Sequence, residues 1–168
     1  MRAAAGPFRG VRLRATFAAA LVGTVAFATV GVAVVDVLRA ALTSNTDSTL
    51  ELRAADIIAL IDSGNPPASI AISSEEGSFV QLIGPGGAVV GASANVAGEP
   101  PLASLASESY QTVSNHTLGD EPFRLHAAGS QSDPPIFVLV GTSLEDNEEI
   151  IRVVCVALGA GLPTLLAL

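Results

Sequence analysis

Residues 15–35 read ATFAAALVGTVAFATVGVAVV and contain no charged residue. At a rise of 1.5 Å per residue, this stretch forms a helix about 31 Å long, which is close to the thickness of a bilayer's hydrocarbon core. Positive flanks stay in the cytoplasm, and acidic Asp36 follows on the other side. We therefore expect a transmembrane helix over 15–35 behind a short cytoplasmic tail, 1–14. The tail carries Arg2, Arg9, Arg12 and Arg14.

A cleaved signal peptide is the alternative interpretation of the same stretch. Its apolar core is longer than the roughly 7–15 residues of a signal peptide, and no small-x-small cleavage site follows at a suitable distance. The residues after the core are Asp36-Val-Leu-Arg39. An uncleaved anchor is therefore the favoured interpretation.

A second apolar run covers residues 150–168 and is still apolar at Leu168. The part of this run that follows Arg152 is slightly too short to cross a membrane, so we expect a second transmembrane helix that is truncated. Arg152 lies near its start, where its charged end can reach the outer headgroups. Pro163 lies inside the run and is expected to kink it. The two runs make the protein multi-pass in the cell membrane, with residues 36–149 as an extracytoplasmic domain.

Acidic and basic residues are distributed very unevenly along the chain. All 16 acidic residues lie in 36–149 with only three arginines, so this segment carries 3 − 16 = −13. Such a charge repels phosphate and excludes a nucleic-acid partner. The single cysteine, Cys155, lies in the second apolar run, so no intrachain disulfide holds the outer domain together.

The first part of the outer domain has a helical pattern. Apolar residues recur at intervals of three and four after residue 50, which predicts one apolar helix face. Ser63-Gly64 and Asn65-Pro66-Pro67 then end the pattern. We expect a juxtamembrane helix over 36–62 that continues the transmembrane helix. Its apolar face consists of Leu50, Ala54, Ile57, Ile58 and Ile61.

Short strand patterns separated by turns follow. The glycine-rich turn 84–87 joins two of them into a hairpin, and the run 136–142 is apolar on both faces, as in a central strand covered by helix. Ser143-Leu-Glu-Asp146 has the spacing of a capping box, so a helix should start there and enter the second apolar run. The fold class is therefore α+β, an antiparallel sheet with flanking helices. The expected strands are 69–73, 79–83, 88–93, 110–113, 123–127 and 136–142, with a helical turn at 102–107.

Several stretches resemble the N-terminal input region of bacterial two-component sensor histidine kinases, particularly those of high-GC actinobacteria. They are VRLRATFAAALV at 11–22, VQLIGPGGAVVGAS at 80–93, PPLASL at 100–105, EPFRLHAAG at 121–129, FVLVGTSLEDNEEIIRVV at 137–154 and LGAGLPTLLAL at 158–168. The resemblance implies a PAS-like outer domain and a homodimer. In the full-length proteins of this family, a HAMP linker, a phospho-accepting histidine helix and a domain that binds ATP and Mg follow, and a cognate response regulator is the partner. The sequence contains none of those parts, so this chain alone is expected to be neither an enzyme nor bound to a cofactor.

Arg124 and His126 are the candidate ligand-binding residues. Two positions apart on a strand, they point to one face, opposite Phe123, Leu125 and Ala127. That face is either a small cationic site for an anionic ligand or simply a solvent-facing side. His116, the other histidine, has no second ligand at metal spacing, so no metal site is expected.

The function implied by the resemblance is extracytoplasmic sensing of an unknown ligand and signalling across the membrane, with Arg152 and Pro163 in the signalling helix. Two alternatives remain open. One is a two-pass accessory or scaffold protein without kinase output. The other is the input region of another receptor type, such as a chemoreceptor or cyclase.

Overall fold

The computed structural model describes residues 8–64, 77–104, 108–114 and 121–167. The expected strand 69–73 lies outside these ranges. The chain divides into two compact units, Met1–Ala40 with Glu149–Leu168, and Ala41–Glu148. The elements in chain order are helix α1 (Phe8–Asp62), strand β1 (Ser78–Ile83), the short helix η2 (Pro85–Gly87), strand β2 (Val89–Ala92), the short helix η3 (Ala94–Val96), strands β3 (Ser109–Ser114), β4 (Pro122–Gly129) and β5 (Phe137–Ser143), and helix α2 (Glu145–Ala167).

Helix α1 is unbroken from Phe8 to Asp62, so the apolar segment 15–35 and the expected helix 36–62 form one element. The polar residues between them do not interrupt it, and several of their hydroxyl groups donate to the backbone carbonyl four residues earlier; Thr46 does so at 3.0 Å. The helix ends where the sequence predicts. Gly64, with φ of +90°, adopts the left-handed conformation that favours glycine, and its N–H donates to the Ile61 carbonyl.

The sheet has five antiparallel strands in the order β2-β1-β5-β4-β3. Strand β5 is central, as its apolar sequence predicts. The β1–β2 hairpin is also confirmed. Its turn is closed by Gly84, whose N–H donates to the Ala88 carbonyl, and it places Gly86 and Gly87 at positive φ.

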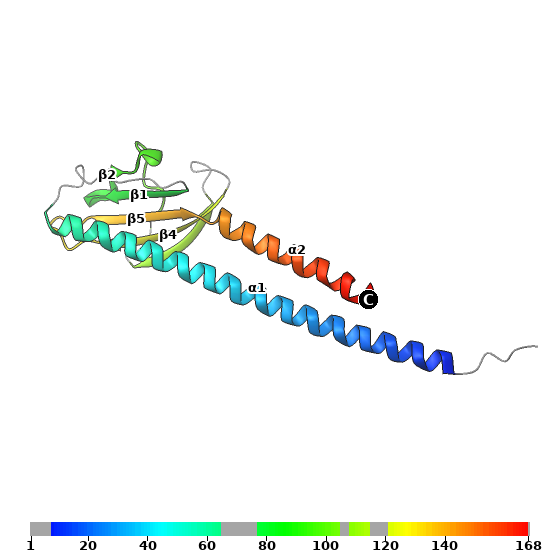
Figure 1. The fold of residues 1–168 in the computed structure, drawn as a ribbon. Coiled ribbons are helices and arrows are strands. Elements are labelled where there is room, and N and C mark those ends of the chain that lie inside the picture. Colours follow the sequence, from blue (N-terminus) through cyan, green and yellow to red (C-terminus); the bar gives the residue numbers. More distant parts are fainter. Residues whose placement is uncertain (1–7, 65–76, 105–107, 115–120, 168) are drawn as a thin grey trace, which may run out of the picture. The chain divides into compact units, whose positions relative to one another are not determined.

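Each face of the sheet carries its own core. The last turns of α1 lie along one face (Figure 1), where Leu50, Ala54, Ile57 and Ile61 are buried against side chains of β1, β4 and β5. Val96 and the loop after it cover the opposite face, which is built from the alternate residues of the same strands. The α+β class is therefore confirmed, with the helix on one face as expected.

The face away from α1 is packed tightly around an aromatic pair. The Phe79 and Phe123 ring centroids lie 5.9 Å apart. A methyl group on Gly141 would overlap the Phe79 ring and the Leu125 side chain, so the glycine in the central strand makes room for this pair. Buried Gln81 also fastens the covering loop, since its side chain accepts from the Leu102 N–H at 3.0 Å.

Two local predictions need correction. The expected helical turn over 102–107 is wrong over its described part, 102–104, which contains no helix. The Gln81 side chain instead bonds to the backbone on either side of Pro101 and holds the start of this part against the sheet. Ser143 remains in β5 and does not cap α2 by the predicted box. Its hydroxyl accepts from the Glu145 N–H at 3.1 Å and donates to Glu121.

In the unit formed by Met1–Ala40 and Glu149–Leu168, the described residues, 8–40 and 149–167, are helical. Among the described residues, α1 is the single helix that is both long and apolar enough to cross a membrane, and only 6% of its most apolar stretch is buried. Its hydroxyl groups are satisfied within the helix; for example, Thr24 donates to the Ala20 carbonyl at 2.8 Å. These features suit a hydrocarbon environment, in which every polar group must find an internal partner.

Candidate coupling site on the α1 face of the sheet

Arg124 of β4 and Asp47 of α1 form a two-pronged ion pair. The guanidinium Nε and Nη2 donate to the two carboxylate oxygens of Asp47 at 2.7 and 2.8 Å. The side chains are 19% and 24% exposed, so the pair is largely withdrawn from water. The hydrogen bond to Asp47 raises the pKa of Arg124 above its already high usual value, although burial opposes this. The pair therefore stays ionised and holds α1 against β4 at a fixed register.

Tyr110 of β3 extends this contact. It lies directly across from His126 in the β3–β4 register, and its ring stacks on the imidazole with centroids 4.4 Å apart. Its hydroxyl donates to Glu51 of α1 at 3.3 Å. The Arg124 guanidinium carbon lies 5.6 Å from the centre of the same ring. Burial, and then the Glu51 carboxylate, raise the pKa of the Tyr110 phenol, so it remains a hydrogen-bond donor.

His126 is buried, with 1% of its surface exposed. The solvent-facing interpretation of this side of β4 is therefore wrong, because α1 and Tyr110 cover it. In the part of the chain that the structure describes, its Nδ1 is the one buried side-chain nitrogen or oxygen without a hydrogen-bond partner.

The structure thus brings the two predicted residues, Arg124 and His126, to one face as expected, but it gives Arg124 a partner. An anionic ligand would have to displace the Asp47 carboxylate from the guanidinium. We call the five residues that meet here the coupling cluster. It consists of Asp47, Glu51, Tyr110, Arg124 and His126.

Sequence reasoning missed the α1 members of the coupling cluster. Asp47 precedes Leu50 by three residues and so continues the buried face of the helix by one turn. An acidic residue in that position was the available signal for a basic partner on the sheet. Tyr110, the only tyrosine, gave no such signal, since its role depends on the register between β3 and β4.

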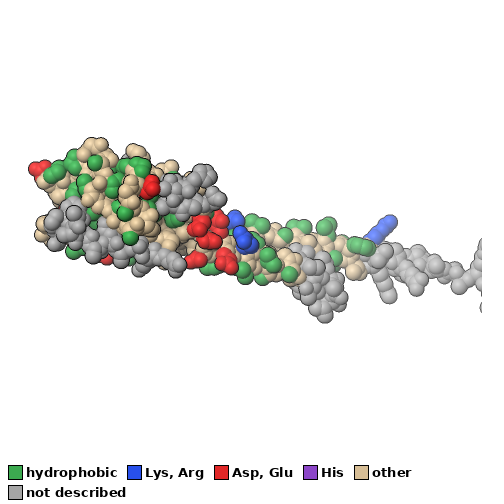
Figure 2. Space-filling view, turned by 90° about the horizontal axis from the view of Figure 1, so that it is seen from above, with side chains coloured by type: hydrophobic (Ala, Val, Ile, Leu, Met, Phe, Trp, Pro, Cys, Tyr) green, Lys and Arg blue, Asp and Glu red, His purple; other side chains and the backbone are tan. Residues whose placement is uncertain are grey.

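The two predicted signalling residues lie on α2, away from the coupling cluster in sequence. Arg152 is exposed, and α2 continues through Pro163 to Ala167. The first turn of α2 is acidic, with Glu145, Asp146 and Glu148. A group of acidic side chains is visible on the face drawn in Figure 2.

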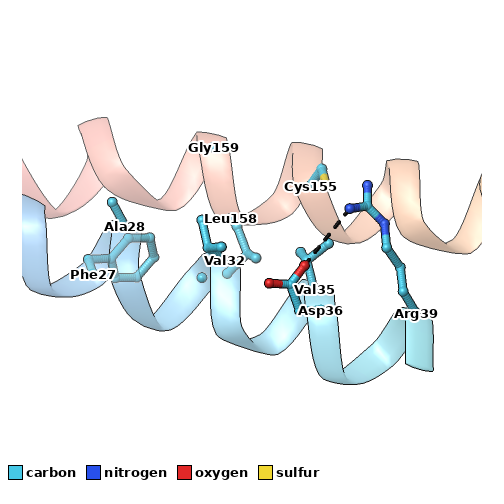
Figure 3. A pocket seen from close by; sticks show the side chains of 10 residues that line it. Phe27, Ala28, Val32, Val35, Asp36, Arg39, Cys155, Leu158 and Gly159 are labelled. Carbon is cyan, nitrogen blue, oxygen red and sulfur yellow. Dashed lines mark ion pairs between the residues drawn. The ribbon is translucent and has the colours of Figure 1, made fainter. Parts of the chain in front are cut away.

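Hollows also occur elsewhere among the described residues. One, of about 310 Å³, lies between α1 and α2 and is lined mainly by small and apolar side chains, including Phe27, Val32 and Leu158 (Figure 3). Asp36 and Arg39 lie at one end of it and approach to 4.0 Å. Another hollow is polar, about 410 Å³, and includes Glu121 and Asp146 in its lining. Among the described residues, no group of three or more histidine, cysteine, aspartate or glutamate side chains is placed to hold a metal ion.

Comparison with known proteins adds no identification, since no family model, curated protein or solved structure matches this chain. The function therefore has to be argued from the coupling cluster and from the two helices.

Proposed function

We propose that this chain is the extracytoplasmic sensing and transmembrane signalling region of a membrane receptor of the sensor histidine kinase type, with a PAS-like outer domain. The carrying observation is the Asp47–Arg124 pair. It joins α1, which continues into the apolar segment, to β4, whose neighbour β5 leads through one residue into α2. The strand order β2-β1-β5-β4-β3, with a helix along one face, also supports a PAS-like domain.

In this proposal the chain crosses the membrane twice, with the N-terminal arginines inside and residues 36–149 outside. Helix α1 is the first span, and α2 begins the second, where Arg152 meets the outer headgroups and Pro163 provides a bend. The functional unit is a homodimer that responds to an unknown extracellular ligand. Kinase activity, ATP, Mg and a response regulator belong to the parts that follow in proteins of this type.

The coupling cluster supplies a mechanism. A ligand or partner that shifts β4 and β5 along α1 must break or re-form the Asp47–Arg124 pair. Because α2 follows β5, the same shift moves α2 relative to α1. Asn147, in the first turn of α2, donates to Thr46 of α1 at 3.2 Å, next to Asp47, and is a second contact that such a shift would change. Two discrete arrangements of these contacts constitute a two-state signal.

A chimaeric receptor tests this function. The chain is fused through its C-terminus to the HAMP linker and kinase core of an unrelated sensor kinase, and reporter output is measured in cells. We expect Asp47→Asn to change basal output several-fold, since a neutral amide cannot hold Arg124 in the same two-pronged pair. The matched control is Asp56→Asn, an exposed acidic residue of the same helix.

Topology reporters complete the test. A periplasmic alkaline phosphatase fused after residue 100 should be active, and one fused to the N-terminus should be inactive. Equal output from Asp47→Asn and Asp56→Asn, or a phosphatase that is inactive after residue 100, would contradict the proposal. Sequencing the reading frame beyond Leu168 distinguishes a kinase core from a chemoreceptor or cyclase output, or from an accessory protein without either.

A further inference from the structure

The apolar hollow between α1 and α2 is a feature that the proposed function leaves unused. Its volume of about 310 Å³ falls at the lower end of the range for small-molecule sites. The two helices meet beside it, since a methyl group on Gly31 would lie 3.7 Å from the Leu158 side chain. The hollow remains because the lining residues Ala28, Gly31 and Gly159 are too small to fill the space.

The position of the hollow along α1 matches one leaflet of a bilayer. In the proposed function, residues 15–35 cross the membrane and Asp36 marks the outer boundary. The lining residues Phe27 and Val35 are eight residues apart, which is about 12 Å along a helix. One leaflet contributes about 15 Å of the hydrocarbon core. The apolar part of the hollow therefore runs through most of the outer leaflet.

The width of the hollow limits what can occupy it. The lining on α1 extends from Phe27 to Arg39, about 18 Å, so a volume of about 310 Å³ leaves a mean cross-section below about 30 Å². A helix with side chains is at least about 10 Å across and occupies about 80 Å². A hydrocarbon chain can therefore enter the hollow, whereas the helix of a second copy cannot.

The outer end of the hollow carries one charge of each sign (Figure 3). Asp36 and Arg39 approach to 4.0 Å, which is too far for a hydrogen bond, and their side chains are 68% and 58% exposed. The Arg39 guanidinium can donate two parallel hydrogen bonds to a phosphate. The Asp36 carboxylate can accept from an ammonium group and would repel a further negative charge. A zwitterionic headgroup complements both residues.

We propose that this hollow binds a phosphatidylethanolamine molecule of the outer leaflet. One acyl chain lies between α1 and α2, the phosphate meets Arg39, and the ammonium group meets Asp36. The inference rests on the membrane placement in the proposed function and adds a lipid partner to it. Because the lipid contacts both helices, it favours the arrangement of α1 and α2 in which the hollow is open, and so biases the signal.

The test is photolabelling of the full chain in nanodiscs of phosphatidylglycerol, whose headgroup has a net negative charge. A phosphatidylethanolamine with a diazirine in one acyl chain is added, and the labelled residues are located by mass spectrometry. Val30 is 62% exposed and does not line the hollow, whereas Val35 lines it and is 9% exposed. Lipid contact at the outer surface alone would label Val30 more. We expect Val35 and Leu158 to be labelled several-fold more than Val30.

Two pairs of variants test the chain and the headgroup separately. Gly159→Leu fills the hollow, and Gly23→Leu is its matched control, because both glycines have open space around an added methyl group and only Gly159 lines the hollow. Arg39→Gln removes the phosphate partner, and Arg152→Gln is the control for an exposed arginine outside the lining. We expect Gly159→Leu and Arg39→Gln each to lower labelling of Val35 by about tenfold, and the controls to leave it unchanged.

Three results would overturn the inference. They are stronger labelling of Val30 than of Val35 in the wild type, equal labelling of Val35 in Gly159→Leu and Gly23→Leu, and equal labelling by a phosphatidylglycerol that carries the same diazirine chain. Labelling of Val30 without Val35 would overturn this inference alone and leave the membrane placement intact. Absence of label from both residues would contradict the placement of α1 in the membrane, and with it the proposed function.

Discussion

The two halves of α1 use apolar residues in opposite ways. In the half that includes residues 15–35, large apolar side chains point outward around the helix, and Phe17 and Val22 are each 69% exposed. In the half that ends at Asp62, Leu50, Ala54, Ile57 and Ile61 form one buried stripe, while Leu52 on the other side is 68% exposed. One continuous helix thus has a half that is apolar all round, as suits a membrane anchor, and a half with a single buried stripe, as suits a helix packed on a sheet.

The largest expected effect tests the buried stripe. Ile57→Asp places a carboxylate among the apolar side chains between α1 and the sheet, where it has no partner. We expect a loss of about 3–5 kcal/mol in the free energy of unfolding, which is a large fraction of the stability of a typical domain. Urea denaturation of the full chain in detergent micelles, followed by hydrogen exchange of β5, measures the loss.

Leu52→Asp is the matched control on the exposed side of the same helix. A surface substitution of this kind changes stability by about 0.5 kcal/mol or less. If both variants lost the same stability, the assignment of buried and exposed sides in this half of α1 would be wrong.

Much of the fold was predictable from the sequence, because these features depend on the local periodicity of apolar residues. The end of α1 at Asp62, the hairpin around Gly86 and the central position of β5 all follow from residue patterns in a single stretch of chain. The cover over Arg124 and His126 was not predictable in the same way. Alternation along β4 says which residues share a face, but what lies against that face depends on Asp47, which is 77 residues away in sequence.

The apolar half of α1 provides the second prediction. Val25→Asp places a charge near the middle of the apolar stretch, where we expect it to oppose membrane insertion by about 2.5–3.5 kcal/mol. The fraction of chains that insert, measured by protection of the N-terminal half from protease in membrane vesicles, should fall. Val25→Leu, which keeps the side chain apolar, should insert like the wild type. Unchanged insertion of Val25→Asp would remove the reason to place this half in lipid.

A smaller effect tests whether Glu51 of α1 really contacts β3. Tyr110 is the only tyrosine, so tyrosinate absorbance reports this residue alone. Its pKa is raised by burial first and by Glu51 second, so the folded chain should titrate above the usual value of about 10 and the urea-unfolded chain near it. The stability linked to the protonated phenol is present below about pH 10 and is lost as the pH rises through the folded pKa.

Glu51→Gln separates the two causes. It should lower the midpoint of the Tyr110 titration only part of the way, because burial remains. A midpoint unchanged by Glu51→Gln would show that α1 does not hold this carboxylate against β3 in solution.

The smallest effect concerns the boundary between the halves, where Asp36 and Arg39 approach to 4.0 Å with side chains 68% and 58% exposed. Water and salt screen an ion pair of this kind, so Arg39→Ala should cost less than about 0.5 kcal/mol in the same denaturation experiment. High salt should reduce the stability difference between Arg39→Ala and the wild type still further. This outcome would fit a boundary defined by the change from lipid to water and not by a specific contact. A loss comparable to that of Ile57→Asp would instead mean that Arg39 holds the two halves in place through an interaction as strong as the buried stripe.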